Sequence, residues 1–188
     1  GNRMTSQRVY RARLAEGYQW IRPLDLSDRR RIVGLGVQRH RATWTPMHME
    51  VIDQFEGRTL LPSTLLACTA NTLTFHPFLV ETLSLDLDSY GESLPVWTES
   101  GTYVLFHATT LTDAVDWANT EADIFPSSGR LMAIRSLALD RERIPDRPFQ
   151  IAGFERGAIL LPATFVALLQ GLSTGMRFTC VWPERGEV

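Results

Sequence analysis

Lysine is absent from this chain, and all nineteen of its basic residues are arginine. Such a composition is typical of GC-rich bacterial genomes, so it excludes no class of protein. Cysteine is scarce as well, because Cys68 and Cys180 are too few for a disulfide framework. We expect both to be buried free thiols, the first on a helix and the second in a strand.

Long apolar runs are also missing. No stretch reaches the ~18 apolar residues that a membrane-spanning helix needs, and no apolar segment follows the basic N-terminus as it does in a secretory signal. With 44% hydrophobic and 21% charged residues, the composition is typical of a globular protein. We therefore expect a cytoplasmic protein that has no membrane partner.

The motifs of common catalytic and metal sites do not occur. There is no HExxH, CxxC or GxSxG pattern, and Gly34 and Gly36 lack the third glycine of a dinucleotide-binding loop. The four histidines stand at unrelated spacings, which indicates no metal site. They are His40, His48, His76 and His107. We expect no catalytic residue, no metal and no cofactor.

One stretch of the sequence occurs twice. Residues 57–67 and 157–167 are identical at six of eleven positions, with no gap between the copies. Each copy is expected to run from a short apolar strand into a helix that begins at a proline, Pro62 or Pro162. A strand is expected to follow each helix. The repeat thus predicts a duplicated strand–helix–strand unit, with copies near 57–80 and 157–182.

Outside the repeat, strand and helix patterns mix without regular alternation, which predicts an α+β fold with mixed or antiparallel sheets. The length suits one domain, 1–188, with two closely packed halves of about 1–100 and 101–188 as the other possibility. Further strands are expected at 8–14, 18–23 (paired with the first), 48–52, 78–87, 102–108, 131–139 and 176–182. Helices are expected at 26–33, capped by Asp25 or Ser27, and at 112–118, with an extended segment at 38–44.

Charge is strongly polarised along the chain. Residues 1–41 carry ten arginines and three acids, whereas residues 81–123 carry nine acids and no arginine. The second segment predicts an acidic face that would attract and orient a basic partner. The alternative is that the two segments lie side by side and neutralise each other.

Four patterns follow one another in the C-terminal half. They are an Asp-x-x-Asp pattern after a strand, a basic residue followed by Ile-Pro, an aromatic residue before a short apolar strand, and a Gly-x-x-Phe strand. Here they correspond to Asp113 with Asp116, Arg143-Ile144-Pro145, Phe149, and Gly175 with Phe178. Together they resemble immunity-protein family 11 of bacterial polymorphic toxin systems, over about residues 101–183. The resemblance implies a protein that binds and neutralises a cognate toxin encoded by a neighbouring gene, with a nuclease-type toxin expected first.

A nuclease has a basic substrate cleft, which an acidic inhibitor surface can occupy. We therefore expect the toxin to contact acids and aromatics of the acidic segment. The first set is Asp86, Asp88, Tyr90, Glu92, Trp97 and Glu99, and the second set is Asp113, Asp116, Trp117 and Asp123. Trp117 fits core packing better than contact, because the family pattern places it on a helix, whereas Trp97 suits either role.

Other functions remain open. A small-molecule-binding enzyme could use Asp113, Asp116 and His107 as acid–base groups, although a histidine within a strand is more often a packed one. A structural or interaction domain with an unknown partner is a second alternative.

A nucleic-acid binder is a third alternative. It would use the arginine-rich residues 3–41, with aromatics available for stacking at Tyr10, Tyr18 and Trp20. The acidic segment argues against this reading, so no direct nucleic-acid partner is expected. The run from Arg29 to Arg31 is expected to be solvated surface.

Overall fold

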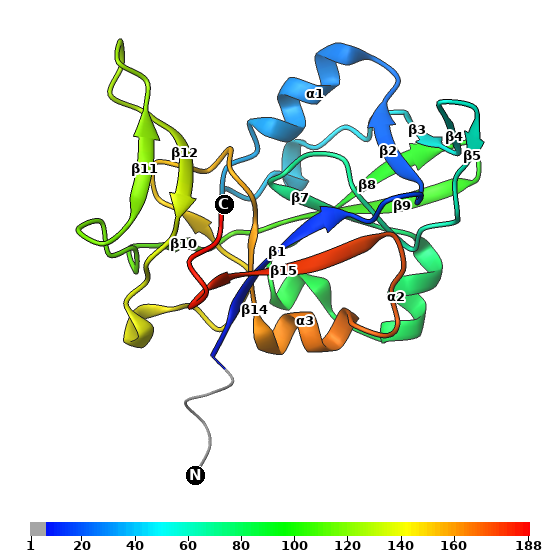
Figure 1. Ribbon diagram of the computed structural model, residues 1–188. Coiled ribbons are helices and arrows are strands. Elements are labelled where there is room, and N and C mark those ends of the chain that lie inside the picture. The colour runs from blue at the N-terminus through cyan, green and yellow to red at the C-terminus, as the bar shows by residue number, and fades with distance from the viewer. Residues whose placement is uncertain (1–6) are drawn as a thin grey trace.

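The largest β-sheet has four antiparallel strands in the spatial order β6-β7-β9-β8 (Figure 1). The computed structural model describes residues 7–188, so the first six residues of the arginine-rich segment lie outside the described part. The strands are β6 (Leu65–Leu66), β7 (Thr72–Phe75), β8 (Glu92–Thr98) and β9 (Gly101–His107). Strands β8 and β9 form a hairpin in which Glu92 is paired with His107. Alternation along β8 buries Leu94 and Val96 and leaves Trp97 on the other face.

A second sheet joins segments from both ends of the chain. Its spatial order is β14-β1-β15, and all of its pairings are antiparallel. The strands are β1 (Val9–Leu14), β14 (Leu160–Pro162) and β15 (Met176–Trp182). Because β1 is the central strand, the N-terminal segment is an integral part of the C-terminal sheet.

Four two-stranded pairs complete the β structure. Three are antiparallel: β2 (Trp20–Pro23) with β3 (Met49–Ile52), β4 (Gln54–Phe55) with β5 (Arg58–Thr59), and β11 (Glu121–Ile124) with β12 (Leu131–Ser136). The fourth is parallel and pairs β10 (Leu111–Thr112) with β13 (Gln150–Ile151). The β11–β12 hairpin projects at one side of the molecule, separated from α1 by a gap in the ribbon (Figure 1).

In residues 7–188, three short α-helices lie around the sheets: α1 (Leu26–Val33), α2 (Pro77–Leu83) and α3 (Ala163–Leu169). Single 3₁₀ turns occur at η1 (Arg41–Thr43), η2 (Leu87–Ser89) and η3 (Arg141–Arg143). The side chain of Asp25 caps α1 by accepting a hydrogen bond from the Ser27 amide, as the sequence predicts. Within residues 7–188, no helix combines the length and apolar content required to cross a bilayer.

Apolar side chains form three buried clusters. The first lies between the two larger sheets and is built around Phe106, whose ring stacks on Phe165 of α3 at 5.8 Å between centroids. The second joins the β1 sheet to the 114–115 and 134–139 segments. The third packs Ile32 of α1 and Met49 of β3 against β8 and β9. Burial of these surfaces is the main stabilising contribution to the fold.

The predicted α+β fold with mixed and antiparallel sheets is confirmed. Expected elements that form, with small shifts at their ends, lie at 8–14, 26–33, 48–52, 102–108, 131–139 and 176–182. The strand expected at 18–23 also forms, but it pairs with β3 and not with β1. The sequence does not predict strand β8, because its first two residues belong to the turn-type sequence at 88–93.

The repeated sequence does not form two copies of one structure. Residues 157–182 give strand, helix and strand as predicted, but residues 62–70 are not helical. Instead, Leu65–Leu66 forms β6, and the amides of Thr64 and Leu65 donate to the carbonyl of Thr174. Tertiary hydrogen bonding therefore overrides the local helix signal. In the first copy of the repeat, the helix begins at Pro77 and not at Pro62. The strand predicted at 78–87 is therefore wrong.

Two other predicted elements are wrong. The segment 112–118 is not a helix, because the Asp116 amide donates to the carbonyl of Ala138 and Val115 forms a β-bridge with Leu139. The segment 38–44 is not extended, because it contains the turn η1. In the first case hydrogen bonds to distant residues decide the backbone conformation, whereas η1 is closed by local bonds such as that from the Trp44 amide to the Arg41 carbonyl.

The two cysteines are free and half-buried. Cys180 lies in β15 as predicted, but Cys68 follows β6 in a loop and not on a helix. Burial raises the pKa of the Cys68 thiol to about 11, with Arg29 opposing the shift.

Candidate functional site

An acidic cavity of about 540 Å³ lies between the β2–β3 pair and the turn that joins β8 to β9. Its walls carry three carboxylates, Glu50, Asp53 and Glu99, and no arginine is among its lining residues. Tyr103 of β9 also lines it and is 5% exposed, with its hydroxyl 3.5 Å from the Ser100 Oγ. The cavity is therefore a concave surface of one charge sign above a buried aromatic side chain.

Two of the three cavity carboxylates carry uncompensated charge. Glu50 accepts a 2.6 Å hydrogen bond from Nε of Arg22, the residue opposite it in the β2–β3 register. Within residues 7–188, Asp53 and Glu99 form no ion pair, and both are exposed. A guanidinium or ammonium group placed here would gain charge-assisted hydrogen bonds. The arrangement can thus hold a cationic group.

A second cluster of polar residues is buried where β8 starts and β9 ends. The Nε2 atom of His107 lies 2.9 Å from Oε1 of Glu92, and the two side chains are 1% and 2% exposed. Nδ1 of His107 lies 3.2 Å from the carbonyl oxygen of Gly36. Carbonyl and ionised carboxylate oxygens only accept, so both contacts are hydrogen bonds when the imidazole carries both protons. Glu92 and His107 then form a buried ion pair.

The carboxylate of Glu92 also fixes the end of the arginine-rich segment. It accepts hydrogen bonds from the backbone amides of His40, at 2.7 Å, and Arg41, at 3.2 Å. Burial opposes ionisation of Glu92, but these bonds and that of His107 outweigh it, so the pKa of the carboxyl lies below its ordinary value. The role of Glu92 is to hold two distant segments together.

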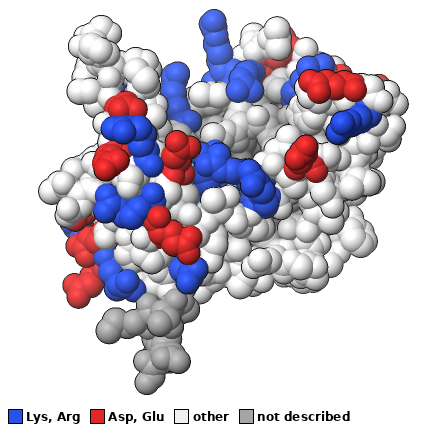
Figure 2. Space-filling view, viewed as in Figure 1, with Lys and Arg blue, Asp and Glu red and all other residues white. Residues whose placement is uncertain are grey.

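Asp88 extends this connection at the surface. It accepts a 2.7 Å hydrogen bond from the Arg41 guanidinium and a 2.9 Å bond from the Ser93 amide. Burial opposes ionisation of this carboxyl, yet the two bonds lower its pKa. Here the basic and acidic segments of the chain lie side by side, which is the alternative to a single acidic face. Figure 2 shows arginines and carboxylates interspersed on the visible face.

The first set of predicted contact residues is divided among different environments. Glu92 is buried, Asp88 is paired with Arg41, and Tyr90 is half-buried against the ring of Phe165. Glu92 is therefore withdrawn from the surface, whereas Asp88 and Tyr90 stay partly exposed. Three members are exposed: Asp86, Trp97 and Glu99.

The Asp88 carboxylate is bonded to the Ser93 amide near the start of β8, whereas Trp97 and Glu99 lie four and six residues further along the chain. At ~3.3 Å per residue they are about 13–20 Å from Asp88. Glu99 lines the acidic cavity. Trp97, at 43% exposure, packs edge to face on His48 on the other face of the strand. The structure therefore places one predicted residue, Glu99, in the cavity with Glu50 and Asp53. Glu50 lies within the strand expected at 48–52 and Asp53 directly follows it, and no sequence motif marks either acid.

The second set of predicted contacts lies beyond β9. Asp113 pairs with Arg143 and Asp123 with Arg135, while Asp116 accepts a 2.7 Å hydrogen bond from Asn119. Trp117 is 48% exposed, so the expectation of core packing for it is wrong. The reason is that the predicted helix, which would have turned this indole inward, does not form.

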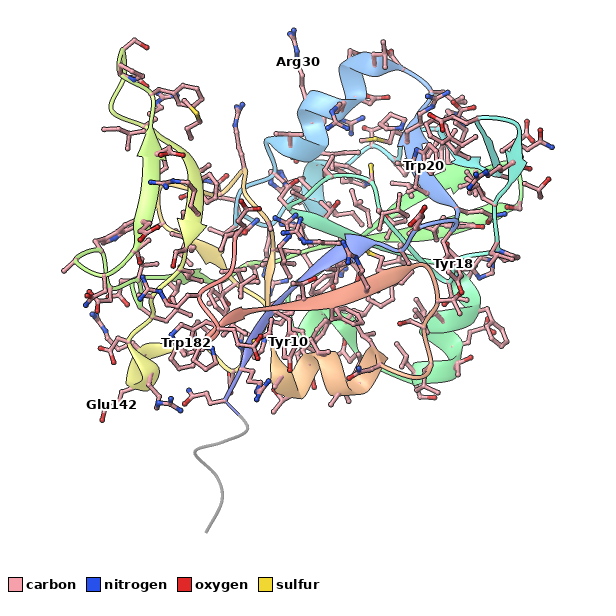
Figure 3. All side chains as sticks on the ribbon, viewed as in Figure 1. Tyr10, Tyr18, Trp20, Arg30, Glu142 and Trp182 are labelled. Atoms are coloured by element: carbon pink, nitrogen blue, oxygen red, sulfur yellow. The ribbon has the colours of Figure 1, made fainter. Side chains whose placement is uncertain are left out.

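The acid–base trio of the enzyme alternative is not assembled. The ring of His107 faces Glu92 and Gly36 inside the protein, whereas Asp113 is exposed and bonded to Arg143. Residues 7–188 hold no group of three or more metal-ligating side chains. The aromatics of the nucleic-acid alternative do not form one group, since Figure 3 places Tyr10 away from Tyr18 and Trp20.

The sequence matches none of the known protein-family models, and no curated protein shows significant similarity to it. The resemblance to immunity-protein family 11 therefore remains a prediction based on the patterns of residues 101–183.

Proposed function

We propose that this protein binds and neutralises a cognate bacterial toxin by holding a basic element of that toxin in the acidic cavity. The observation that carries the proposal is the concave cluster of Glu50, Asp53 and Glu99, with two of the three charges uncompensated. The resemblance in the C-terminal half supplies the class of partner, and the cavity supplies a surface of the matching charge. A nuclease-type toxin fits best, since its substrate cleft is basic.

The surroundings of the cavity suit a protein partner. Phe55, two residues from Asp53, is 51% exposed, and its ring packs edge to face against Trp20 at 5.0 Å. An exposed aromatic side chain beside a charged pocket is the kind of residue that anchors an interface. A stable complex would bury about 1,200–2,000 Å² in total, so the contact extends beyond the cavity to this rim.

The test is co-expression with the C-terminal domain of the protein encoded next to this gene, scored by growth rescue and co-purification. Asp53→Arg with Glu99→Arg replaces two exposed acids of the cavity. Close charge pairs contribute about 1.5–7 kcal/mol each, so the double variant is expected to weaken the complex at least ~100-fold.

A matched control reverses two exposed acids outside the cavity, in the variant Glu16→Arg with Glu81→Arg. This variant should rescue growth like the unaltered protein. Equal affinity of the cavity variant and the control would exclude the cavity as the contact. A neighbouring domain that is harmless to the cell would remove the support for an immunity function.

A further inference from the structure

A second cleft in the molecule has the opposite character to the acidic cavity. One part, of about 670 Å³, lies between the β11–β12 hairpin and the turn at 153–157, and it is lined by Phe125, Arg130, Met132 and Arg156 among others. A second part, of about 480 Å³, lies against α1 and is lined by Leu26, Arg29, Arg30, Val33 and Arg156. Arg156 lines both parts, which together are termed the basic cleft. Figure 2 shows the hollow beside the projecting hairpin, with arginine side chains along it.

The arginines of the basic cleft have no carboxylate partners in the described part of the chain. Arg29, Arg30, Arg130 and Arg156 take part in none of its ion pairs, although seven other arginines do. The single acid of the lining, Glu155, accepts a hydrogen bond from the Gly153 amide within its own turn. Arg30 points away from the body of the molecule (Figure 3). The fold thus brings together four uncompensated positive charges from three separate segments.

Apolar side chains are exposed beside these charges. Phe125 is 44% exposed, Met132 is 46% exposed and Leu26 is 80% exposed. Clustered apolar groups at the surface, combined with arginine, are characteristic of sites that contact another protein. Phe125 and Met132 belong to the β11–β12 hairpin, which projects from the rest of the molecule (Figure 1).

We propose that the basic cleft docks an acidic polypeptide segment that carries apolar or aromatic side chains. Carboxylates of the segment would pair with the arginine forks, which suit bidentate contacts. Its apolar side chains would cover Phe125, Met132 and Leu26. A single-stranded nucleic acid fits less well, because of these three side chains Phe125 alone is aromatic, whereas Met132 and Leu26 present no π-face for base stacking. This site differs in charge sign and in location from the acidic cavity, so it does not depend on the toxin proposal.

The experiment is a selection of random 12-residue displayed peptides on the full chain, followed by fluorescence anisotropy with the most enriched peptide. Enriched peptides are expected to be rich in Asp, Glu and apolar residues and poor in Lys and Arg. Arg130→Glu with Arg156→Glu should weaken binding of that peptide at least 10-fold, and the milder Arg130→Gln with Arg156→Gln about 3-fold. The milder pair keeps the test valid if charge reversal impairs folding.

The matched control is Arg58→Glu with Arg177→Glu, which reverses two exposed arginines on β5 and β15, outside the basic cleft. It should bind the peptide within twofold of the unaltered chain. The proposal is overturned if no peptide is enriched, if the enriched peptides are neutral or basic, or if both cleft variants bind unchanged. It is equally overturned if a fluorescein-labelled 20-nucleotide single-stranded DNA binds more tightly than the peptide and loses affinity in the same variants.

Discussion

His107 and Glu92 form a buried pair that joins the acidic and arginine-rich parts of the chain. They face each other across β8 and β9, with 2.9 Å between the His107 Nε2 and the Glu92 Oε1. The remaining hydrogen-bonding capacity of the pair goes to Gly36, His40 and Arg41. The loop that follows α1 is therefore fixed to the central hairpin by one carboxylate and one imidazole.

Removal of one member of this pair should strongly destabilise the fold. Glu92→Ala leaves His107 and two backbone amides without their acceptor in a buried site, which is expected to cost about 3–5 kcal/mol. Urea unfolding followed by circular dichroism measures the change. Glu16→Ala, at an exposed position, is the control and should stay within about 0.5 kcal/mol. A similar free energy of unfolding for both variants would contradict the assigned role. Because loss of Glu92 is expected to destabilise the fold, a charge-reversal variant that includes this residue cannot be used to map a binding surface.

Stability should fall in acid. The pKa values of Glu92 and Asp88 are lower in the folded protein than in the unfolded chain. The unfolded chain therefore takes up protons first as the pH falls, so the stabilisation is complete at neutral pH and is lost below about pH 4.

Urea midpoints between pH 7 and pH 2.5 measure this loss, and Glu92→Gln should show a shallower decline than the unaltered chain. Parallel pH profiles for the two proteins would show that Glu92 does not contribute.

Gly175 should tolerate alanine less well than Gly171. Both have left-handed backbones, with φ of +108° and +87°, so the conformational cost of alanine is similar at the two sites. A Cβ at Gly175 would lie 2.4 Å from the Leu65 carbonyl oxygen, whereas Gly171 has open space around it. The free energies of unfolding obtained from melting curves of the two variants should therefore differ by about 1–3 kcal/mol, with Gly175→Ala the less stable. Equal stabilities would show that the segment at 63–65 moves aside freely.

The Cys68 thiol should react slowly in the folded protein. Burial raises its pKa to about 11, so little thiolate is present at pH 8. In a Cys180→Ser background, alkylation by iodoacetamide should be about 100-fold slower for the folded chain than for the same chain in urea. Comparable rates in the two conditions would show that Cys68 is not held in a buried site.

The predictions from sequence that hold are those that depend on neighbouring residues. Asp25 marks the start of α1, and the apolar run at 102–108 gives β9 because its pattern is complete within seven residues. The helix predicted after Pro62 fails for the opposite reason. Its backbone amides bond to Thr174, more than a hundred residues away, and no local pattern reports such a bond.

The candidate sites depend still more on the tertiary structure. The α+β class, the separation of charge along the chain and the placement of α1, α3, β1, β9 and β15 can all be predicted from the order of the residues. The burial of Glu92, the grouping of Glu99 with Glu50 and Asp53, and the shared cleft of Arg30 and Arg156 become visible in the folded structure alone. The physical reason is that charge and side-chain type are properties of single residues. Burial and proximity arise from strand pairing and core packing between segments far apart in the chain.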